Sequence, residues 1–483
     1  MGKGRRKVNA DSNALAGEVG TIRRTAPTRI ALGYPARYKV AASSLGYQVV
    51  YRIWNEAPAV VCERFFPDST GRGRNALVTL ESGLPVQSAH AIAFSVASEM
   101  DIYGVVALLE SCGLSPLRAH RGASVAPVII GGPLTILDPR LVSPLADVVV
   151  VGEGEEALPV IRDALADAPD KETFLASLDG AAPGLWIPSL NHEPPIAAHA
   201  PVDLIPAFAA TWSKHAELKD LFLIEAARGC ERACSFCVMS RRMDQAGPFR
   251  AAPVERVLQH IPANAPGVGL VGAAVTDHPD IEQMVDLIVR RGHRVSLSSI
   301  RADRLTEQLT RSLVAGGLKS LTLAADGSSE DLRRSVKKGI TKDHLFAAVT
   351  IAAAHGIRRI KVYSMVGLPG EQDADMEELA GLLKDLSAHL SLSIAVQAFV
   401  PKPGTPLANV PMADLPAIRH RLQLLRRLLA GKVRMIPTSP RWSWLDWKIA
   451  HMGERAAHVA IKARSHGGTF AAWKRAIENQ GEK

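Results

Sequence analysis

The sequence lacks any run of about 18 or more uninterrupted apolar residues, although 47% of its 483 residues are hydrophobic. A helix that crosses a bilayer needs about 20 predominantly apolar residues, so the sequence predicts no membrane span. The basic N-terminal segment, MGKGRRKVNADSNALAG, also lacks the apolar run of a secretory signal. We therefore expect residues 1–27 to form a disordered basic tail on a cytoplasmic protein.

Cysteine is scarce, with five residues in the whole chain. A disulfide framework is typical of small secreted domains, so an odd number in a chain of this length argues against one. Cys62 and Cys112 lie far from each other in the sequence, and we predict that both are buried structural thiols. The other three lie within eight residues of one another, in the segment GCERACSFCVMSRR at residues 229–242, and require a different explanation.

The charge balance is basic, since 57 Lys and Arg exceed 48 Asp and Glu and give a formal net charge of +9. Such an excess is compatible with nucleic-acid binding. The basic residues are spread along the sequence, however, apart from the short cluster Arg5, Arg6 and Lys7. Scattered charge is typical of a solvated surface, so nucleic-acid binding remains an alternative without a specific signal.

The length favours two or three domains, and residues 28–170 predict the first, an α/β domain with a doubly wound, Rossmann-like parallel sheet. Near-continuous apolar strands such as APVIIGG and ADVVVV alternate with helical segments, which indicates a sheet covered on both faces. Glycine-rich turns follow two of these strands, where such folds bind ligands, although tight turns alone would also explain them. The residues concerned are Gly131, Gly132, Gly152, Glu153 and Gly154.

Three further segments are expected after this domain. The Pro-rich residues 171–215 predict a surface linker, and residues 216–430 contain six strand-like segments alternating with helices, which predict a (β/α)6-type partial TIM barrel. The three cysteines follow its first strand, at the end where barrel enzymes collect their chemistry. Residues 431–483 predict a small helical appendix, in which Trp442, Trp444 and Trp447 either pack or form a stacking platform.

The cysteines have the spacing Cys-x3-Cys-x2-Cys, formed by Cys230, Cys234 and Cys237. A zinc site normally takes four ligands from two spaced pairs, and this loop has no obvious fourth ligand. A c-type haem attachment would need a following histidine, which is absent. Three thiolates can hold three irons of a four-iron, four-sulfur cluster, which leaves the fourth iron open to the amine and carboxylate of a small molecule.

This motif, with Phe236 just before the third cysteine, resembles the signature of the radical S-adenosylmethionine (SAM) superfamily. The resemblance implies that Cys230, Cys234 and Cys237 bind a [4Fe-4S] cluster, at which SAM is cleaved reductively to a 5′-deoxyadenosyl radical. It also implies a one-electron donor such as flavodoxin or ferredoxin as partner. Arg228, Arg241 and Arg242 flank the motif and are candidates to balance its charge, with surface solvation as the alternative.

The same resemblance implies SAM contacts on several strands. Where the superfamily has a Gly-Gly-Glu stretch for the SAM amine, this sequence has Gly272-Ala273-Ala274 and no glutamate, so backbone carbonyls are expected there instead. The other implied contacts are Phe236 near adenine, Ser298 near the ribose or carboxylate, Asp326 near the ribose hydroxyls, and Val366 and Gly367 near adenine.

The segments VIIGGPLTILDP and ADVVVVGEGEEAL resemble the cobalamin (B12)-binding-type domain that precedes the barrel in one radical SAM subclass, and other segments resemble a little-characterised branch of it. The resemblance implies cobalamin near the glycine-rich turns at residues 131–132 and 152–154, and methyl transfer to an unactivated carbon. The Asp-x-His-x-x-Gly motif, whose histidine ligates cobalt, is absent from residues 28–170. Either the lower axial position lacks a histidine, or the domain keeps the fold without the cofactor.

Three alternatives remain open. The radical could serve cobalamin-independent cyclisation, rearrangement or oxidation, or the cluster could be structural or sensing in a non-catalytic protein. FVPKPGTPL also resembles a stretch in methylthiotransferases, but those enzymes carry a second cysteine triad, which Cys62 and Cys112 cannot supply. No residue identifies the substrate or a catalytic side chain beyond the cofactor ligands.

Overall fold

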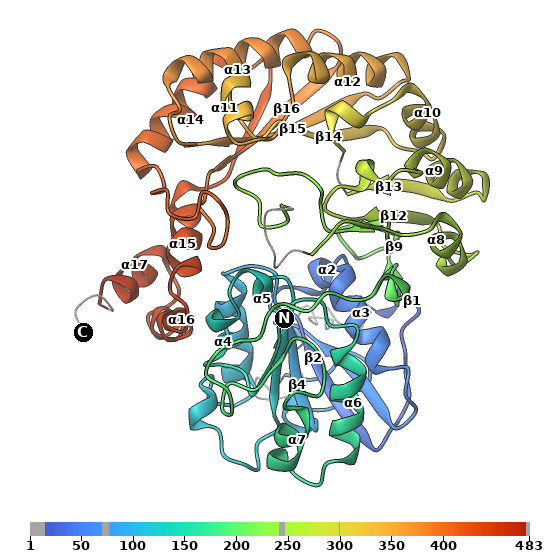
Figure 1. The fold of residues 1–483 in the computed structure, drawn as a ribbon, viewed down its shortest axis with the longest axis vertical. Coiled ribbons are helices and arrows are strands. Elements are labelled where there is room, and N and C mark those ends of the chain that lie inside the picture. The colour runs from blue at the N-terminus through green and yellow to red at the C-terminus, as the bar shows by residue number, and fades with distance from the viewer. Residues whose placement is uncertain (1–14, 70–76, 241–246, 299, 480–483) are drawn as a thin grey trace, which may run out of the picture. The chain divides into compact units, whose positions relative to one another are not determined.

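The structure is a computed structural model that describes residues 15–69, 77–240, 247–298 and 300–479. It divides into two compact units (Figure 1), which are described separately. Unit 1 comprises Met1–Leu223 and Met452–Lys483, and unit 2 comprises Ile224–His451. Among the described residues, no helix is both long enough and apolar enough to cross a membrane.

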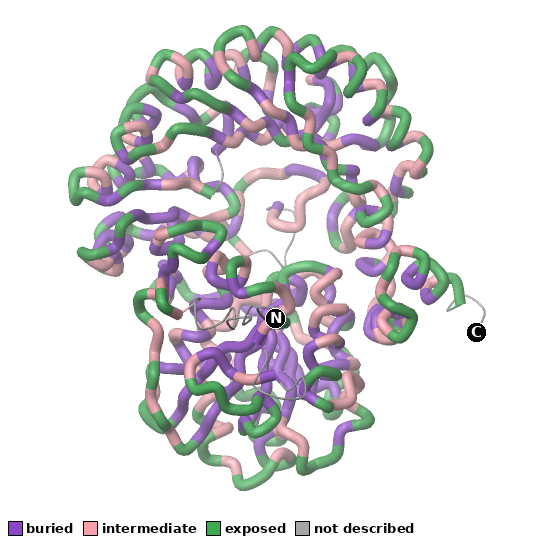
Figure 2. Tube along the Cα trace, turned by 180° about the vertical axis from the view of Figure 1, so that it is seen from behind, coloured by how far each residue is buried: buried purple, intermediate pink, exposed green. Residues whose placement is uncertain are grey.

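Unit 1 is built on a six-stranded sheet with the order β3-β2-β4-β5-β6-β7. Its first five members are parallel and the edge strand β7 is antiparallel. Every residue of β2, β3 and β4 is buried, as Figure 2 shows in purple, because helices cover both faces. The strands are β2 (Thr28–Gly33), β3 (Val60–Phe65), β4 (Ala91–Ser95), β5 (Val128–Gly131), β6 (Val148–Val150) and β7 (Leu185–Trp186).

This strand order confirms the doubly wound, Rossmann-like fold. The chain reverses direction across the sheet between β2 and β4, which is the topological switch point where open α/β sheets bind ligands. The helices of the unit are α2 (Tyr38–Ala41), α3 (Leu45–Trp54), α4 (Asp101–Ser111), α5 (Leu134–Leu137), α6 (Ala157–Asp167), α7 (Lys171–Leu178), α16 (Arg455–Ser465) and α17 (Phe470–Glu478).

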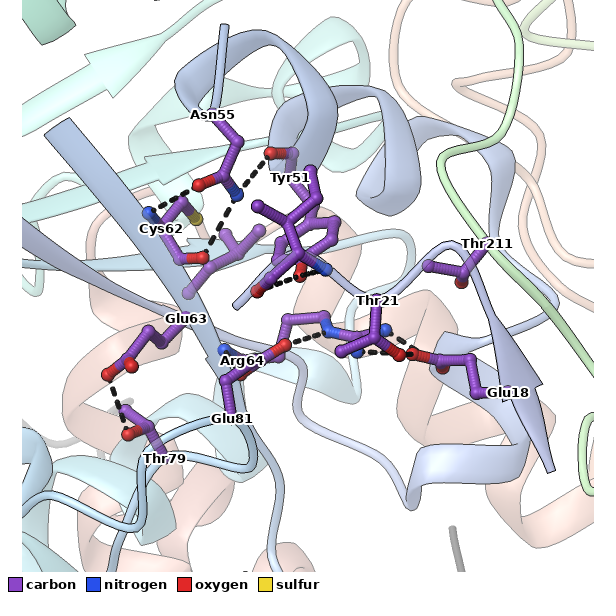
Figure 3. Close-up of polar contacts among 12 residues, drawn as sticks. Glu18, Thr21, Tyr51, Asn55, Cys62, Glu63, Arg64, Thr79, Glu81 and Thr211 are labelled. Carbon is purple, nitrogen blue, oxygen red and sulfur yellow. Dashed lines mark hydrogen bonds and ion pairs between the residues drawn. The ribbon is translucent and has the colours of Figure 1, made fainter. Parts of the chain in front are cut away.

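The prediction of a disordered tail through residue 27 is wrong for residues 15–27, while residues 1–14 lie outside the described part of the chain. Strand β1 (Glu18–Val19) pairs with β8 (Trp212–Ser213), and the Glu18 carboxylate lies against the guanidinium of Arg64 (Figure 3). The segment is therefore held by backbone pairing and by an acidic residue whose side chain is fully buried. Hydrophobic periodicity does not predict an ion pair between residues as far apart in sequence as Glu18 and Arg64.

The prediction of a Pro-rich surface linker at 171–215 is also wrong. Its first residues form α7, and its middle supplies β7, the edge strand of the sheet. The apolar side chains of this segment, such as Phe174 and Trp186, are buried in unit 1. A high proline content was therefore a poor indicator of a surface linker, because this segment contributes side chains to the core.

Unit 2 is an arc of parallel strands with helices on its outer side (Figure 1), which confirms the partial barrel. Sheet β9-β12-β13 meets sheet β14-β15-β16-β17 through a parallel bridge between Ile300 and Leu323. The strands are β9 (Phe222–Glu225), β12 (Gly267–Val271), β13 (Arg294–Leu297), β14 (Ser320–Ala324), β15 (Arg359–Val366), β16 (Ser391–Ala398) and β17 (Arg434–Pro437).

The helices of unit 2 connect these strands. They are α8 (Val254–His260), α9 (Ile281–Arg290), α10 (Glu307–Ala315), α11 (Glu330–Ser335), α12 (Lys342–Ala354), α13 (Asp373–Leu386), α14 (Leu415–Leu429) and α15 (Pro440–Ala450). A short antiparallel pair, β10 (Ala227–Arg228) with β11 (Arg250–Ala251), lies outside the main sheet.

The structure divides the predicted appendix at 431–483 between the two units. Strand β17 extends the barrel sheet and α15 packs beside it, whereas α16 and α17 belong to unit 1 and lie against α4. Trp473 is 1% exposed and packs on Tyr103, with ring centroids 5.6 Å apart. The sequence did not predict that the chain returns to unit 1 at α16 and α17, because helical periodicity does not specify which surface a helix covers.

Candidate functional site

The cysteine loop begins at the carboxyl end of β9 and lies inside the arc of unit 2 (Figure 1). Its first turn requires glycine, because Gly229 has φ +76° and a Cβ there would lie 2.3 Å from the carbonyl oxygen of Pro248. The β10–β11 pair fixes the two ends of this loop. The backbone thus presents the cysteines at the end of the barrel where enzymes of this fold place their chemistry.

The three thiols Cys230, Cys234 and Cys237 are free. Burial raises the pKa of the Cys237 thiol to about 11 and also raises that of Cys234, and the other thiolates of the motif add to both shifts. The loop also folds back on itself here, because the backbone N–H of Cys237 donates to the carbonyl of Cys234 at 3.3 Å. Metal binding would replace their protons, because the thiolate is the ligand form.

The donor set suits a cluster better than a single ion. A single zinc ion normally takes four protein ligands, whereas this loop offers three thiols. In a [4Fe-4S] cluster each thiolate binds a different iron, so the donors surround a larger object. The backbone N–H of Arg232 also points at the Cys230 sulfur, at 3.4 Å, which suits a sulfur that carries negative charge.

An arginine within the motif ties the loop to the next strand. Arg232 forms a two-point contact with Asp277, with Nε 2.9 Å from Oδ2, and Asp277 follows β12. Burial alone would raise the pKa of Asp277, but the hydrogen bond and charge of Arg232, helped by Arg301 and Arg304, bring it below its usual value. The sequence prediction missed this pair, because an Arg and an Asp 45 residues apart carry no local signal.

A second charged pair lies beside the thiols. Asp326 adopts the left-handed region, with φ +56°, and its Oδ2 accepts a hydrogen bond from Nζ of Lys338 at 2.6 Å. Both side chains are largely buried. Lys338 follows Val336, whose carbonyl accepts from the backbone N–H of Ser235 at 2.9 Å, and its charge offsets part of the effect of burial on the pKa values of Cys234 and Cys237. Asp326 was expected from the sequence, whereas Lys338 was not.

Phe236 packs in a small apolar cluster inside the barrel. Its neighbours there include Leu332 and Val336 from the segment after β14, Leu368 after β15 and Phe399 after β16. The backbone N–H of Ser235 donates to the carbonyl of Val336, which fixes the loop against the same segment. The cysteine motif therefore meets segments at the carboxyl ends of strands that are more than 80 residues away in sequence.

Two of the residues expected to contact SAM meet after β12 and β13. The hydroxyl of Ser298 donates to the carbonyl of Gly272 at 3.2 Å. A Cβ on Gly272 would lie 2.6 Å from the carbonyl oxygen of Ala227, so glycine is required for close approach to the strand that leads into the motif. Ala273, the next residue, is exposed.

Val366 and Gly367 lie at the end of β15, where Gly367 has φ +88°. Its backbone N–H donates to the buried carboxylate of Glu371, which also accepts from Ser328 and pairs with Arg421 at 3.2 Å. Burial raises the pKa of Glu371, although these three partners oppose the shift. Glu371 thus joins the turns after β14 and β15, a role that the sequence prediction did not include.

In unit 1 the expected glycines are placed mainly by packing. Gly132, with φ +115°, would carry a Cβ 2.4 Å from the carbonyl oxygen of Val96, so it lets the turn after β5 approach the turn after β4. Gly131 lies against Val150. The hydroxyl of Thr135 lies 2.9 Å from both the Gly132 and Val150 carbonyls and locks this turn.

The turn after β6 is covered by a later part of the chain. Gly152 has φ +92° and forms a parallel bridge with Ala198, whose backbone a Cβ would strike at 2.5 Å. Glu153 accepts a hydrogen bond from the backbone of Ala200 at 2.7 Å, and Gly154 lies over Leu158. These contacts hold the conformation of the turn at all three residues.

The switch point lies elsewhere, between β2 and β4. Here Asp101 at the start of α4 accepts backbone hydrogen bonds from Ala97 and Ser98, at 2.6 and 2.9 Å, and burial raises its pKa. Ala97 and Ser98 are exposed, while Tyr34 beside them is buried. The sequence prediction placed the ligand site at the glycine-rich turns after β5 and β6, because strand order, which defines the switch point, cannot be read from the sequence.

The remaining sequence predictions concern two isolated cysteines, the arginines beside the motif and the tryptophans near the C-terminus. Cys62 and Cys112 are buried free thiols, as predicted. Arg228 pairs with Glu225 at 2.7 Å, and Arg241 and Arg242 lie outside the described residues. Trp442 is 41% exposed, and Nζ of Lys448 lies 4.3 Å from the ring centroid of Trp447.

Two family models match the chain, and together they cover more than half of it. Residues 46–188 match the model described as radical SAM proteins, N-terminal, and residues 224–383 match the radical SAM superfamily model. The chain belongs to the radical SAM superfamily. The cofactors of this superfamily are a [4Fe-4S] cluster and SAM, and the cysteine loop of unit 2 offers the donors that such a cluster needs.

Curated relatives of this radical SAM chain have varied names. An uncharacterized protein of Methanocaldococcus jannaschii is 34% identical over 42% of this chain and 46% of its own length. An uncharacterized methyltransferase of Pyrococcus horikoshii is 24% identical over 59% and 63%. The tRNA-2-methylthio-N(6)-dimethylallyladenosine synthase of Legionella pneumophila is 28% identical over 43% and 49%. The chain therefore spans between about half and two thirds of the length of these relatives.

Among solved structures, the cobalamin-dependent radical enzyme OxsB with aqua-cobalamin bound has a similar fold. The TM-score is 0.52 at 12% identity, and the match covers 86% of this chain and 58% of OxsB. At this identity the likeness concerns the fold.

Proposed function

We propose that this chain is a radical SAM enzyme that cleaves SAM reductively and, with cobalamin, transfers a methyl group to an unactivated carbon. The observation that carries the first part is the loop of three free cysteines at the carboxyl end of β9, inside a barrel of the superfamily's fold. The second part rests on the Rossmann-like unit 1 and on its likeness to the fold of OxsB.

Cys230, Cys234 and Cys237 would hold the cluster through three of its irons, which would leave the fourth for SAM. When bound, these groups supply an electron to cleave SAM and a carrier for the methyl group. Lys338 would attract the SAM carboxylate, because its ammonium lies near two of the thiols and is held in place by Asp326. Arg232 and Asp277 keep the loop in position.

The SAM amine would meet backbone carbonyls at Gly272 and Ala273, since this stretch has no glutamate. Ser298 would orient the Gly272 carbonyl through their hydrogen bond. The adenine would lie near Phe236 and the turn at Val366 and Gly367, whose shape is held by Glu371. Asp326 would accept from the ribose hydroxyls with the oxygen that Lys338 does not engage.

In unit 1, cobalamin would bind at the carboxyl edge of the sheet, where Ser98 and its neighbours lie exposed at the switch point. The glycine-rich turns after β5 and β6 would form the remainder of that edge. The net reaction balances as follows: a substrate C–H, two SAM and two electrons give a C–CH3 product, methionine, 5′-deoxyadenosine and S-adenosylhomocysteine. The electrons require a donor of the flavodoxin or ferredoxin class and a reducing compartment such as the cytoplasm.

The decisive experiment uses full-length protein purified without oxygen, with its cluster reconstituted and cobalamin supplied. The absorption spectrum after desalting reports bound cobalamin, and 5′-deoxyadenosine and S-adenosylhomocysteine are measured after reductant and SAM are added. Bound cobalamin with both products supports the proposal. 5′-Deoxyadenosine without cobalamin would favour a cobalamin-independent radical reaction. The absence of SAM cleavage by reconstituted protein would contradict the enzymatic proposal and favour a sensing cluster.

Two variants sharpen this experiment. Cys234→Ala should abolish 5′-deoxyadenosine formation, because one cluster ligand is lost. Ser98→Trp fills the exposed turn at the switch point and should prevent cobalamin retention, whereas Ser111→Trp places the same bulk at the other end of α4 and should not. Equal cobalamin retention in both variants would contradict the site that we propose in unit 1.

The substrate class remains a proposal of its own. The relative from Legionella pneumophila is named for a modified adenosine of tRNA, so we propose RNA as the first macromolecular substrate to test. Methylthio transfer itself is not favoured, because the only cysteines outside the motif, Cys62 and Cys112, are single buried thiols on different elements.

A further inference from the structure

The loops that lead from a helix into a strand in unit 2 have an unusual charge composition. There are six such loops, and none of them contains Asp or Glu. They are residues 261–266, 291–293, 316–319, 355–358, 387–390 and 430–433, which precede β12, β13, β14, β15, β16 and β17. Acidic residues occur in the turns at the other ends of these strands, for example Asp277, Asp303 and Asp326.

The fold brings the six loops to one edge of the barrel. The strands that they precede are parallel, and β13 meets β14 through a parallel bridge, so all their amino-terminal ends lie at the same edge. That edge is opposite the cysteine loop, which follows the carboxyl end of β9. Along β15, eight residues at about 3.3 Å each separate the two edges by roughly 25 Å.

This edge carries ten exposed basic side chains, in the loops and in the residues that directly flank them. We call this set the basic edge, and it comprises Arg290, Arg291, Arg294, Lys319, Arg358, Arg359, Arg426, Arg427, Lys432 and Arg434. Two acidic residues lie close in sequence. Asp286 pairs with Arg290 at 2.8 Å, and Asp385 is exposed near the end of α13. Glu307 also reaches this edge, since its Oε2 lies 3.9 Å from Nε2 of His355 in the loop before β15. Ten basic against three acidic residues leave an excess of seven positive charges at this end of the unit, against a net charge of +9 for the chain.

A repeated local structure presents these cations. Helices α9, α10, α12 and α14 each end near a glycine with positive φ, at Gly292, Gly317, Gly356 and Gly431. Such a glycine closes a helix tightly, and a basic residue follows it by one to three positions. The cations are therefore held at the first residues of the strands, as when Arg359 lies level with Ser320 and Ser391 on the neighbouring strands.

The chemistry of the set favours phosphate. Eight of its members are arginines, whose planar guanidinium can donate two parallel hydrogen bonds to one phosphate group. None of the large apolar side chains exposed in the described residues lies within the six loops. A surface that inserts into a membrane would combine basic and apolar groups, so this one suits a soluble polyanion better.

We propose that the basic edge binds the phosphate backbone of an RNA. The edge lies away from the cysteine loop, so an RNA could dock there while another part of the same molecule approaches the barrel mouth. The choice of RNA over DNA rests on the substrate class proposed above, whereas the binding face rests on charge and topology alone. Binding can be measured without SAM cleavage, so failure of one proposal is distinguishable from failure of the other.

The test compares two double variants of the full chain that each remove two exposed arginines from unit 2. Arg358→Gln with Arg359→Gln acts on the basic edge. Arg311→Gln with Arg419→Gln acts on the exposed faces of α10 and α14 and serves as the matched control. Binding of a fluorescein-labelled RNA hairpin is followed by anisotropy between about 50 and 200 mM salt. A thermal melt and 5′-deoxyadenosine formation, which neither variant should change, report folding.

We expect salt-dependent binding by the unmodified protein. The edge variant should bind roughly 10- to 100-fold more weakly at about 0.1 M salt, with a log–log salt slope reduced by about 2, because two phosphate contacts are lost. The control variant should bind as the unmodified protein does. Absence of RNA binding, equal loss in both variants, tighter binding to a DNA hairpin of the same sequence, or displacement of RNA by phosphatidylglycerol vesicles would each overturn the proposal.

Discussion

Replacing Glu18 with alanine removes one of two carboxylates that surround the buried guanidinium of Arg64 (Figure 3). The side chain of Arg64 is 2% exposed, and those of Glu18 and Glu81 are 0% and 2% exposed. Arg64 Nη1 lies 3.0 Å from Glu18 Oε2, and Nε lies 2.6 Å from Glu81 Oε1. The Tyr38 hydroxyl also donates to Glu18 at 2.6 Å, so the variant leaves several buried donors unsatisfied.

The expected cost follows from this burial. Removing one partner of a buried ion pair typically destabilises a protein by about 3–5 kcal/mol, because an uncompensated charge remains in the interior. Glu81 still engages Arg64, so we place Glu18→Ala near the lower value, about 3 kcal/mol. A matched exposed pair is available in the same unit: Lys39 and Glu217 are 3.1 Å apart and more than half exposed. Glu217→Ala should cost at most about 1 kcal/mol.

Native-state hydrogen exchange with mass spectrometry is the suitable assay, because a chain with two units need not unfold in one step. Peptides that contain β3, which carries Arg64, report the opening of unit 1. A loss of about 3 kcal/mol corresponds to exchange roughly 150-fold faster in Glu18→Ala, against fivefold or less in Glu217→Ala. Similar exchange in the two variants would refute the argument that burial gives the Glu18–Arg64 contact its strength.

Three further predictions follow from the described contacts. The pKa of Glu18 is lowered, since Arg64 and three hydrogen bonds outweigh burial; its contribution to stability is therefore complete above the unfolded value near 4.5 and is lost as pH falls below it. In chemical denaturation, Glu18→Gln should flatten this acid dependence, and an unchanged slope would contradict it. Lys338→Met should weaken SAM binding tenfold or more in equilibrium dialysis while the absorbance of the reconstituted cluster is retained; loss of the cluster instead would show that Lys338 acts structurally. Trp473→Ala should destabilise the packing of α17 on unit 1 by about 3–5 kcal/mol, measured as faster amide exchange in α16 and α17, and no change there would refute that docking.

The chemistry of the motif could be predicted from the sequence because its ligands are close together. Cys230, Cys234 and Cys237 lie within one loop, so their number, spacing and free state follow from local information. The strand periodicity likewise predicted a Rossmann-like sheet and a partial barrel, since near-continuous apolar strands between helices are typical of parallel sheets. Both predictions are confirmed.

Contacts between distant residues could not be predicted in this way. Arg232 meets Asp277 across 45 positions, and Glu371 meets Arg421 across 50, without a pattern that links them. The glycine-rich turn at Gly152 was read as a ligand site, but its conformation is explained by the backbone of Ala198, which comes from the segment expected to be a linker. Glycine is required both where a ligand approaches the backbone closely and where another segment of backbone does. The sequence alone therefore does not distinguish a ligand site from close packing.

The sequence by itself thus supplied the cysteine motif as the candidate cluster ligands, and it determined the two α/β units and the overall excess of basic charge. Tertiary structure decided which groups act together. The strand order places the switch point of unit 1 at the turns after β2 and β4. Helices α16 and α17 belong to that unit, and basic residues from separate loops lie at one end of the barrel. The physical reason is that hydrophobic periodicity specifies which face of an element is buried, whereas strand order and chain direction specify which ends become neighbours.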